Sequence, residues 1–529
     1  MSKITKYLNQ LIVGNVYDSP EITDFYSTDR SALKITPKLV AFPESTTDIR
    51  KLLRFFDNLA TKDINIGIAV RGSGLDELGA DLTDGLVVST EKLNHLMEID
   101  TRERLVRVQA GITLKELNTA LSISGLTLPI KANENETIGS LIATAARDGY
   151  ANKYGGIMEY VERAEVVLAN GECIQTGRLS KYAVAKKTAG KTLEGNIYRE
   201  IYKLTETHVP TLNTIKTAPV KSMAGYPNAI FVNKKDTIDL LPLLFGSEGT
   251  LCIISEVILK IVPLHKSRIR VITTFPKLSL ALKFLELTNN LKPCELSITD
   301  IRILKQAEEA GKNLSDITRK LEEGYAIFAS FDEKISYISH KFDAVSKSLS
   351  RSSKIFIEDN DNKQLFDEFE NTIPNYLNLK EKGERVSLLS NFSMPAAELP
   401  AFIDELAELE KTIKLDLPIY GSYTNNIYSL RPSFDITDKD YPKRACEFLS
   451  LGSSIIVKHN GSLTGGSPEG RIKALITNRH LGDAEKELYQ SIKTAFDPHG
   501  ILSPSVKLGA NTNFTVHHFR TTPSSKLVL

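Results

Sequence analysis

The stretch "IAVRGSGLDELGADLTDGLVVS", residues 68–89, places a glycine-rich loop between two short apolar runs. The runs "IAV" and "GLVVS" are typical of buried strands, and Gly72, Gly74 and Gly79 lie between them. Consecutive backbone N–H groups in such a loop can form a nest that binds an anion, and Arg71 adds positive charge beside it. The segment therefore predicts a strand–loop–strand unit, with a phosphate-binding loop and a plain glycine turn as the two interpretations.

The spacing of these glycines argues against a nicotinamide dinucleotide fold. A Rossmann fingerprint has Gly-x-Gly-x-x-Gly at the start of a helix. Here the spacing is Gly-x-Gly-x-x-x-x-Gly, and a second strand follows instead of a helix. The loop therefore connects two strands and needs a different fold around it.

The bulk composition is that of a soluble globular protein. The chain has 529 residues, a length that predicts two to four domains. Of these residues 41% are hydrophobic and 25% are charged. The net charge is only +1, so no nucleic-acid partner is expected. No window approaches eighteen apolar residues, so no transmembrane segment is expected. The four scattered cysteines, none in a Cys-x-x-Cys pair, exclude iron–sulfur and zinc-ribbon spacings and favour a reducing compartment. We expect a cytoplasmic protein, with a peripheral membrane role left open.

The order of apolar patterns along the chain predicts the α+β class. Between residues 40 and 262, short β-rich runs alternate with helical stretches, and Asn170-Gly171 marks a hairpin. After Pro263 the pattern resets into three strand–helix units, "RIRVITTFPKLSLALKFLELTNN", "EGYAIFASFDEKISYISHKFDAVSKSL" and "ERVSLLSNFSMPAAELPAFIDELAELEKT". Such units predict a second domain in which helices cover a sheet.

These patterns divide the chain into four parts. We expect an N-terminal helical segment at residues 1–35 and a first domain at residues 36–263, with a basic insertion at about residues 178–220. A second domain is expected at residues 264–508, followed by a polar tail at residues 509–529 that we expect to be loosely ordered.

Three further stretches carry small residues where a flat ligand could lie against backbone. They are "ETIGSLIATAARDGYANKYG" at residues 136–155, "KSMAGYP" at residues 221–227 and "LFGSEGTLCIISE" at residues 244–256. Together with "RGSG", "VQAGITLKELNTAL" and "VVLANGE", and in this order, they resemble the PCMH-type FAD-binding domain of the vanillyl-alcohol oxidase superfamily. The second half is similar to the FAD-linked oxidase C-terminal domain, through "PCELSITDIRIL", "IVKHNGSLTGG" and "AFDPHGILSP".

The resemblance implies a two-part FAD-binding domain followed by an α+β cap domain, and it implies which residues border the cofactor. No histidine or cysteine lies in the loop of residues 71–79, so the family's histidyl flavin link is not expected there and the FAD would be bound noncovalently. The residues implied in FAD binding are Arg71, Gly72, Ser73, Gly74, Gly79, Thr137, Ile138, Gly139, Ser140, Thr144, Gly246, Ser247, Glu248, Gly249 and Ile253.

Two carboxylates depart from the family's pattern in the glycine loop. Asp76 and Glu77 stand where the family has small or hydroxyl residues, and both would repel a diphosphate unless they point away from it. One alternative is that Asp76 caps a short helix.

The catalytic half departs further. The chain resembles the D-lactate and D-2-hydroxyglutarate dehydrogenases, and it stops where the fused iron–sulfur domain of the long type would begin. Where those families carry metal ligands and a base, this chain has Ser422, Ser429, Gly466 and Ser467, so no metal site is expected. The remaining catalytic candidates are Arg431, Tyr428 and Tyr423, each of which could instead serve the fold.

The resemblance implies an FAD-dependent oxidoreductase that oxidises a small hydroxylated substrate by hydride transfer to the flavin. It would be 2-hydroxyacid dehydrogenase-like, without the usual metal-dependent chemistry. Its electrons would pass to an unidentified acceptor, such as a separate iron–sulfur protein or a quinone. The alternative is a degenerate, catalytically inactive flavin-fold protein that acts as a binding or electron-transfer partner.

Overall fold

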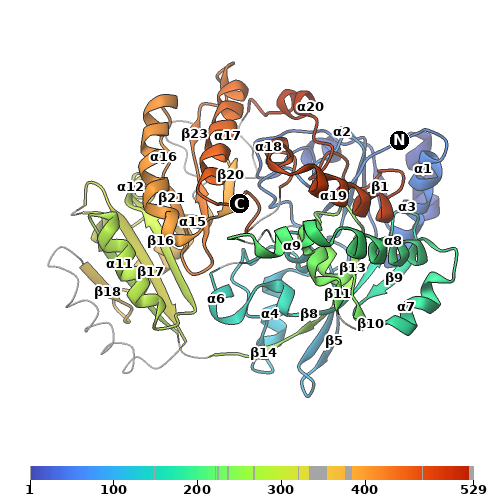
Figure 1. Ribbon diagram of the computed structural model, residues 1–529, viewed down its shortest axis with the longest axis horizontal. Coiled ribbons are helices and arrows are strands. Elements are labelled where there is room, and N and C mark those ends of the chain that lie inside the picture. The colour runs from blue at the N-terminus through green and yellow to red at the C-terminus, as the bar shows by residue number, and fades with distance from the viewer. Residues whose placement is uncertain are drawn as a thin grey trace.

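The computed structural model describes residues 2–147, 149–220, 222, 225–234, 237–265, 268–319, 321–332, 354–375, 384–466 and 469–522. Figure 1 shows two sheet-containing halves side by side, an N-terminal half up to residue 263 and a C-terminal half that follows it. Helices cover the sheets of both halves, which confirms the α+β class.

The first sheet of the N-terminal half holds the glycine loop. Its order is β1 (Asn15–Tyr17), β2 (Leu39–Phe42), β4 (Leu86–Ser89), β3 (Ile68–Arg71). Strands β2, β4 and β3 are parallel, and α3 (Thr46–Ala60) crosses between β2 and β3. The glycine loop leaves β3 and returns as β4, so the predicted strand–loop–strand unit is confirmed. The first 35 residues contain α1 (Lys3–Leu11) and α2 (Pro20–Phe25), but also β1, which pairs antiparallel with β2.

The second sheet is antiparallel and five-stranded. Its order is β5 (Leu96–Asp100), β6 (Leu105–Gln109), β13 (Ile253–Lys260), β8 (Val161–Val167), β9 (Cys173–Thr176). Strands β8 and β9 form the predicted hairpin, with Gly171 at φ +79° in its turn. Against this sheet pack α4 (Leu114–Ser122) and α5 (Ile138–Ala143), whose leucines and isoleucines are buried in one core. The short strands β7 (Leu126–Thr127) and β14 (Val262–Pro263) pair with each other in a separate two-stranded sheet.

The insertion is mostly helical. It contains α7 (Lys181–Thr188), α8 (Leu193–Thr207) and α9 (Val209–Thr217). The small strands β10 (Leu179–Ser180), β12 (Thr237–Ile238) and β11 (Asn233–Lys234) form a three-stranded sheet beside it. Short helical pieces complete this half: α6 (Ala151–Tyr154), η1 (Ile157–Glu159), η2 (Tyr226–Phe231) and α10 (Leu241–Leu244).

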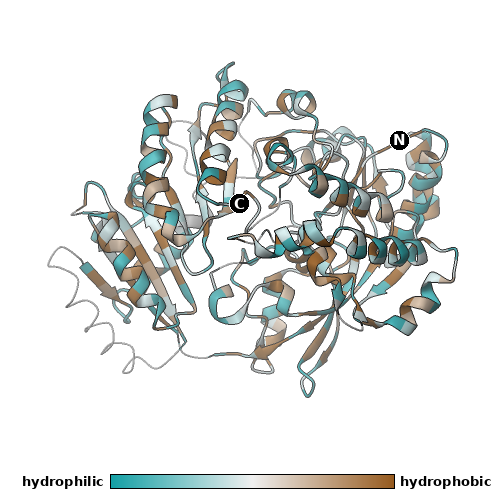
Figure 2. Ribbon diagram, in the orientation of Figure 1, coloured by the Kyte–Doolittle hydropathy of each residue, from teal (hydrophilic) through white to brown (hydrophobic). Residues whose placement is uncertain are grey.

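A seven-stranded antiparallel sheet forms the C-terminal half. Its order is β18 (Lys354–Ile357), β15 (Ile269–Phe275), β17 (Tyr325–Phe331), β16 (Glu295–Asp300), β21 (Ile419–Ser422), β22 (Ile427–Leu430), β20 (Leu389–Ser393). Neighbouring residues point to opposite faces, so Val271 and Ile272 enter two different cores. Helices α11 (Leu278–Asn289), α16 (Leu399–Ile413) and α17 (Tyr441–Lys458) contribute to one core, and α12 (Ile301–Glu309), α13 (Ser315–Thr318) and α15 (Lys363–Asn375) to the other. Figure 2 shows hydrophobic and hydrophilic stretches on these helices, as expected for elements half covered by a sheet.

The predicted strand–helix units match this sheet in part. The first unit is β15 with α11, and the third is β20 with α16. The strand of the second unit is β17, while its expected helix lies within residues 333–349, outside the described residues. The alternating pattern gave no indication of β16, β21 and β22, which complete the sheet between β17 and β20. The pair β19 (Glu384–Arg385) and β23 (Ser433–Phe434) forms a separate small ladder.

The C-terminal segment returns to the N-terminal half. Helices α18 (Ala474–His480) and α19 (Asp483–Phe496) lie over that half in Figure 1, and Tyr489 stacks on Tyr226 of the first core. The expectation of a loosely ordered tail is wrong for residues 512–520. Helix α20 (Thr512–His517) is followed by Phe519, which is buried, and by Arg520, whose Nε donates to the carbonyl of Ser31 at 2.9 Å.

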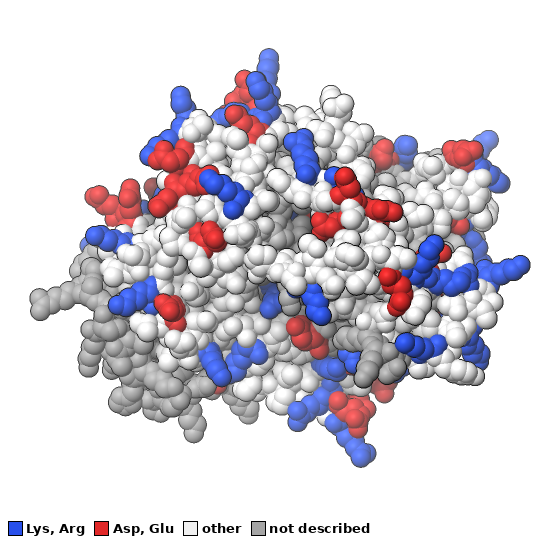
Figure 3. Space-filling view, viewed as in Figure 1, with Lys and Arg blue, Asp and Glu red and all other residues white. Residues whose placement is uncertain are grey.

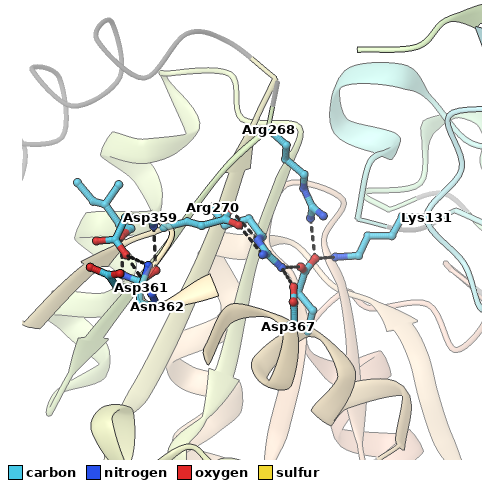
Figure 4. A network of polar contacts seen from close by, with 10 residues as sticks. Lys131, Arg268, Arg270, Asp359, Asp361, Asn362 and Asp367 are labelled. Atoms are coloured by element: carbon cyan, nitrogen blue, oxygen red, sulfur yellow. Dashed lines mark hydrogen bonds and ion pairs between the residues drawn. The ribbon is translucent and has the colours of Figure 1, made fainter. Parts of the chain in front are cut away.

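An ion network joins the two halves (Figure 4). Lys131 of the N-terminal half contacts Glu295 at 2.6 Å and Glu370 at 2.7 Å. Glu370 also contacts Arg268 at 2.6 Å and Arg270 at 2.5 Å. Burial alone would raise the pKa of Glu370, but the attraction of Lys131 and Arg268 outweighs it and lowers the pKa to about 2.

This network predicts acid-sensitive stability. A depressed carboxyl pKa stabilises the fold above the unfolded value of 4.5, and the contribution is lost as the pH falls toward 2. We expect Glu370→Gln to lower the free energy of unfolding at neutral pH and to flatten its decline between about pH 5 and pH 3. Urea unfolding across that pH range measures both effects. Parallel curves for the two proteins would contradict the role of Glu370.

On the face seen in Figure 3, basic and acidic residues are interspersed, and neither sign of charge forms a large patch. This agrees with the net charge of +1. Among the described helices, none combines the length and the apolar character required to cross a bilayer.

Candidate functional site

A cavity of ≈ 380 Å³ is lined by residues of both halves. Its volume is in the range of pockets that bind small molecules and cofactors. The N-terminal half supplies the glycine loop, the surroundings of α5 and the turn before β13. The C-terminal half supplies Ser390, Asn391, Tyr420, Arg431 and Gly466.

Two positions of the glycine loop leave no room for a side chain. Gly74 has φ +72°, and a Cβ there would lie 2.2 Å from Nη2 of Arg71. A Cβ on Gly72 would lie 2.5 Å from Oγ1 of Thr137. The N–H groups of residues 73–75 donate to no atom of the described part of the chain. The loop therefore presents backbone donors at the cavity wall, in the form of an anion-binding nest.

Arg71 supports this loop from below and is not on the cavity wall. Its guanidinium donates to the carbonyl of Thr28 at 2.9 Å, and its Nε lies 3.5 Å from a carboxylate oxygen of Asp81. The same group stacks over the ring of Tyr26, 5.1 Å from its centroid. Arg71 is 3% exposed, so it holds the loop in place and does not reach a ligand directly.

The two acidic residues of the loop each have a partner of their own. One oxygen of Asp76 accepts the N–H groups of Leu78 at 3.1 Å and Ala80 at 2.7 Å. Asp76 therefore closes a turn. The alternative that Asp76 caps a short helix is wrong, because no helix follows it in the loop. Glu77 instead forms an ion pair with Arg431. Neither carboxylate therefore competes with an anion for the donors of residues 73–75.

Burial and neighbouring carboxylates raise the pKa of Asp76 to about 7. Oxygen atoms of Asp29, Asp76 and Asp81 lie within 4.8 Å of one another beneath the loop. Burial, and then repulsion by Asp81 and Asp76, raises the pKa of Asp29 as well. Asp76 is therefore partly protonated near neutral pH, which reduces the negative charge behind the anion-binding loop.

Helix α5 forms the second part of the wall. The side chain of Thr137 caps it by accepting the N–H of Ser140 at 3.2 Å. A Cβ on Gly139 would lie 2.9 Å from the Cβ of Ala110, so this glycine permits the close approach of α5 to the loop after β6. Thr137, Gly139, Ser140 and Thr144 face the cavity, whereas Ile138 is fully buried in the core.

The turn before β13 forms the third part. Glu248 has φ +52° and Gly249 has φ +70°. The carboxylate of Glu248 pairs with Lys507 at 2.9 Å and accepts the N–H groups of Gly470 at 2.8 Å and Glu469 at 3.1 Å. Its charge is thus neutralised internally, and the turn is tied to the C-terminal segment.

The structure brings most of the residues implied in cofactor binding to one wall. Eleven line the cavity: Gly72, Ser73, Gly74, Thr137, Gly139, Ser140, Thr144, Ser247, Glu248, Gly249 and Ile253. The cavity wall does not include Arg71, Gly79, Ile138 and Gly246. Gly79 sits at φ +79° against Leu33, and the N–H of Gly246 donates to Ile142.

Arg431 lies at the C-terminal wall, held by residues from both halves. One guanidinium nitrogen contacts Glu77 at 2.6 Å, and its Nε donates to the hydroxyl of Tyr420 at 3.0 Å. Ser387 donates to the same Glu77 at 3.0 Å. Arg431, which directly follows β22, therefore links the C-terminal half to the glycine loop.

The two tyrosines chosen from the sequence do not line the cavity. Tyr428 is fully buried, its ring packs 6.3 Å from that of Phe392, and burial raises its pKa. Tyr423 is half-buried against the core of the C-terminal half. Tyr420 occupies the wall instead and was not singled out from the sequence.

The positions at which the resemblance implied lost metal ligands are Ser422, Ser429, Gly466 and Ser467, and those that the structure describes make contacts within the fold. Ser429 donates to the side chain of Asn391 at 3.1 Å and accepts its backbone N–H at 2.8 Å. Ser422 accepts from Asn425 at 2.9 Å. Gly466 lines the cavity, and a Cβ there would lie 2.6 Å from Ile427. Ser467 lies outside the described residues.

Glu136 is a carboxylate of the cavity wall that the sequence analysis did not select. It directly precedes Thr137, the capping residue of α5. Burial, and then the negative charge of Glu77, raises its pKa to about 7. A carboxyl group with this pKa can accept a proton near neutral pH.

Two family models match the chain in sequence order. The FAD binding domain matches residues 37–177, and the C-terminal domain of FAD linked oxidases matches residues 264–506. The glycine loop, α5 and β8 fall in the first match, and the whole seven-stranded sheet falls in the second.

Curated relatives cover most of the chain. A D-2-hydroxyglutarate dehydrogenase of Pantoea ananatis is 25% identical over 90% of this chain and 48% of its own length. A D-lactate dehydrogenase of Archaeoglobus fulgidus is 26% identical over 91% of this chain and 95% of its own length. The chain thus spans about half the length of the D-2-hydroxyglutarate dehydrogenases that it matches.

Solved structures share the fold at low identity. The 4-ethylphenol oxidase from Gulosibacter chungangensis superposes with a TM-score of 0.69 at 13% identity, covering 96% of this chain and 98% of that one. An alkyldihydroxyacetonephosphate synthase superposes with a TM-score of 0.61 at 16% identity, covering 92% of this chain and 82% of that one.

Proposed function

Because the chain belongs to the flavoproteins that join an FAD-binding domain to an FAD-linked oxidase C-terminal domain, we propose that it oxidises a small hydroxylated substrate. The observation that carries this proposal is the cavity between the two halves. One wall offers the backbone donors of residues 73–75, and the other supplies Tyr420 and Arg431. The names of the curated relatives, dehydrogenases of D-lactate and D-2-hydroxyglutarate, support a hydroxylated substrate.

The residues present fit the diphosphate of FAD. The glycine loop leaves N–H groups for its oxygens, and Asp76 and Glu77 are engaged by backbone and by Arg431. Small residues along α5, among them Gly139 and Ser140, leave room for a flat ring system against the backbone. When bound, FAD supplies the acceptor for the hydride that leaves the carbinol carbon.

We propose noncovalent attachment. The glycine loop contains no histidine or cysteine. Cys252 does line the cavity, but burial raises the pKa of its thiol to about 12, so it is a poor nucleophile. The four cysteines, Cys173, Cys252, Cys294 and Cys446, are all free, which supports a reducing compartment such as the cytoplasm.

Glu136 is the proposed base. Oxidation of an alcohol to a carbonyl removes one proton from the hydroxyl and one hydride from the carbon. Glu136 lines the cavity, and its pKa of about 7 suits proton acceptance near neutral pH. The hydroxyl of Tyr420, already bonded to Arg431, is placed to orient the substrate oxygen.

This assignment predicts a pH profile. The deprotonated form of Glu136 is the active one, so the rate of substrate-driven flavin reduction should rise as the pH passes through about 7. We expect Glu136→Gln to lower that rate by about 10²–10⁴-fold and to remove the rise. Rapid-mixing absorbance measures the rate, and the two proteins are compared at equal flavin content. The control is Glu134→Gln, at an exposed glutamate two residues earlier, which should react at the rate of the wild type. An unchanged profile in Glu136→Gln would exclude this base.

The electrons must leave the protein after substrate oxidation. The dispersed free cysteines give this chain no ligand set for an iron–sulfur cluster. We therefore propose an external acceptor, either a separate iron–sulfur protein or a quinone.

Anaerobic mixing of the flavin-loaded protein with a panel of small alcohols tests the oxidoreductase function. Loss of the flavin absorbance with at least one alcohol is the expected result. A flavin that can be photoreduced but resists every alcohol would favour the alternative, a catalytically inactive binding or electron-transfer partner.

A further inference from the structure

The cavity contains its own carboxylate at the position where Arg431 would receive an anion. Glu77 reaches Arg431 from the glycine loop, 354 residues earlier in the chain, at 2.6 Å. The arginine is 5% exposed, so few directions remain from which a second carboxylate can approach its guanidinium. An arginine buried in this way is most stable with an ionised partner.

The pair is fixed on both sides. Ser387 donates a second hydrogen bond to Glu77 at 3.0 Å, and Tyr420 accepts from Nε of Arg431 at 3.0 Å. Burial alone would raise the pKa of Glu77, but Arg431 and Arg30 outweigh it and lower the pKa. Glu77 therefore stays ionised, and its carboxylate remains paired with the guanidinium of Arg431.

Arg30 and Arg147 also line the cavity, but both belong to the half that holds the anion-binding loop. Among the described lining residues of the C-terminal half, Arg431 is the one cation that could receive a carboxylate. The charged residues of the wall are Arg30, Asp76, Glu77, Asp81, Glu136, Arg147, Glu248 and Arg431.

We propose that Glu77 is a specificity-determining residue that occupies the anion position of Arg431, so that the substrate is a hydroxylated compound without a carboxylate. This inference rests on the proposed oxidoreductase function and narrows its substrate class to neutral or cationic alcohols. A carboxylate substrate would have to displace Glu77 and leave two like charges close together in a buried site, which is costly.

Oxalate is the probe, because it presents a carboxylate and is too oxidised to act as an alcohol. Equilibrium dialysis of the flavin-loaded protein with labelled oxalate measures binding directly, and perturbation of the flavin spectrum gives a second readout. We expect no saturable binding to the wild type up to about 10 mM. Glu77→Gln keeps the size of the side chain and removes its charge, and should bind oxalate at least about tenfold more tightly.

Two controls assign the effect to this pair. The double variant Glu77→Gln with Arg431→Met should lose the gained oxalate binding. Glu408→Gln, on an exposed carboxylate paired with Lys411, should behave as the wild type. Oxalate binding to the wild type as tight as to Glu77→Gln would overturn the proposal, and so would a Glu77→Gln protein that gains nothing.

D-Lactate and D-lactamide supply a catalytic comparison, since they differ only in carboxylate against amide. A wild-type flavin bleached faster by D-lactate than by D-lactamide would also overturn the proposal, even where the variant fails to fold. A protein that holds no flavin would contradict the proposed function, whereas a flavin-loaded protein that binds oxalate equally with and without the charge of Glu77 would contradict this inference alone.

Discussion

Replacing Gly74 by valine should leave a folded protein that has lost most of its bound flavin. A Cβ at this position would lie 2.2 Å from Nη2 of Arg71, whose guanidinium is held by Thr28 and Asp81. The φ of +72° is also a poor conformation for a β-branched residue. The backbone of the loop must move to avoid the contact with Arg71 or to reach a favourable φ, and either movement displaces the N–H donors of residues 73–75. We expect flavin content to fall at least about tenfold, measured by acid release and absorbance.

Gly125→Val is the matched control. Gly125 has φ +68°, and a Cβ there meets no atom within 4 Å. Both variants therefore carry the same backbone strain, of about 1–3 kcal/mol, but only one disturbs the cavity. Circular dichroism should show both proteins folded. Full flavin occupancy in Gly74→Val would mean that the loop does not hold the cofactor.

Lys507→Met should strongly lower the free energy of unfolding. The ammonium of Lys507 lies 2.9 Å from Glu248 and 3.4 Å from Glu469, and the side chains of Lys507 and Glu248 are both 1% exposed. Burial would lower the pKa of Lys507, but the two glutamates outweigh it and raise the pKa. Removing the cation leaves Glu248 charged and buried, which costs about 3–5 kcal/mol.

The free energy of urea unfolding measures this cost. Lys411→Met is the control, because Lys411 pairs with Glu408 at 2.7 Å while both side chains remain more than two-thirds exposed. Exposed pairs contribute little, so this variant should unfold as the wild type does. Similar unfolding curves for both variants would show that the Lys507–Glu248 pair does not stabilise the contact between the turn before β13 and the C-terminal segment.

The local signals in the sequence were sufficient for the elements near the glycine loop. Apolar runs around glycines predicted β3 and β4, and Asn170-Gly171 predicted the hairpin of β8 and β9. These signals are short-range, since turn conformation and strand burial depend on residues a few positions apart.

The choice between the tyrosines could have been improved by strand alternation. Successive side chains of a strand point to opposite faces, so the segment that leads to Arg431 cannot direct both residue 428 and residue 429 toward the cavity. Ser429 shares the face of Arg431, and Tyr428 must enter the core, where the structure places it. The same alternation groups Tyr420 with Ser422 on β21.

Long-range pairings could not be derived in this way. Nothing near Glu77 in the sequence indicates a partner 354 residues away, because that contact depends on how the two halves dock. The C-terminal tail is a similar case. Its polar composition predicted weak order, but Phe519 pairs with Leu33 and packs against Tyr441, and Arg520 donates to Ser31.

The visible absorption spectrum of the freshly purified protein, followed by acid release of any bound flavin, shows whether the chain holds FAD. We expect a yellow protein that releases about one FAD per chain, because the N–H groups of residues 73–75 donate to no atom of the described residues and Glu77 is held away by Arg431. A colourless protein that stays colourless after incubation with FAD would contradict this expectation.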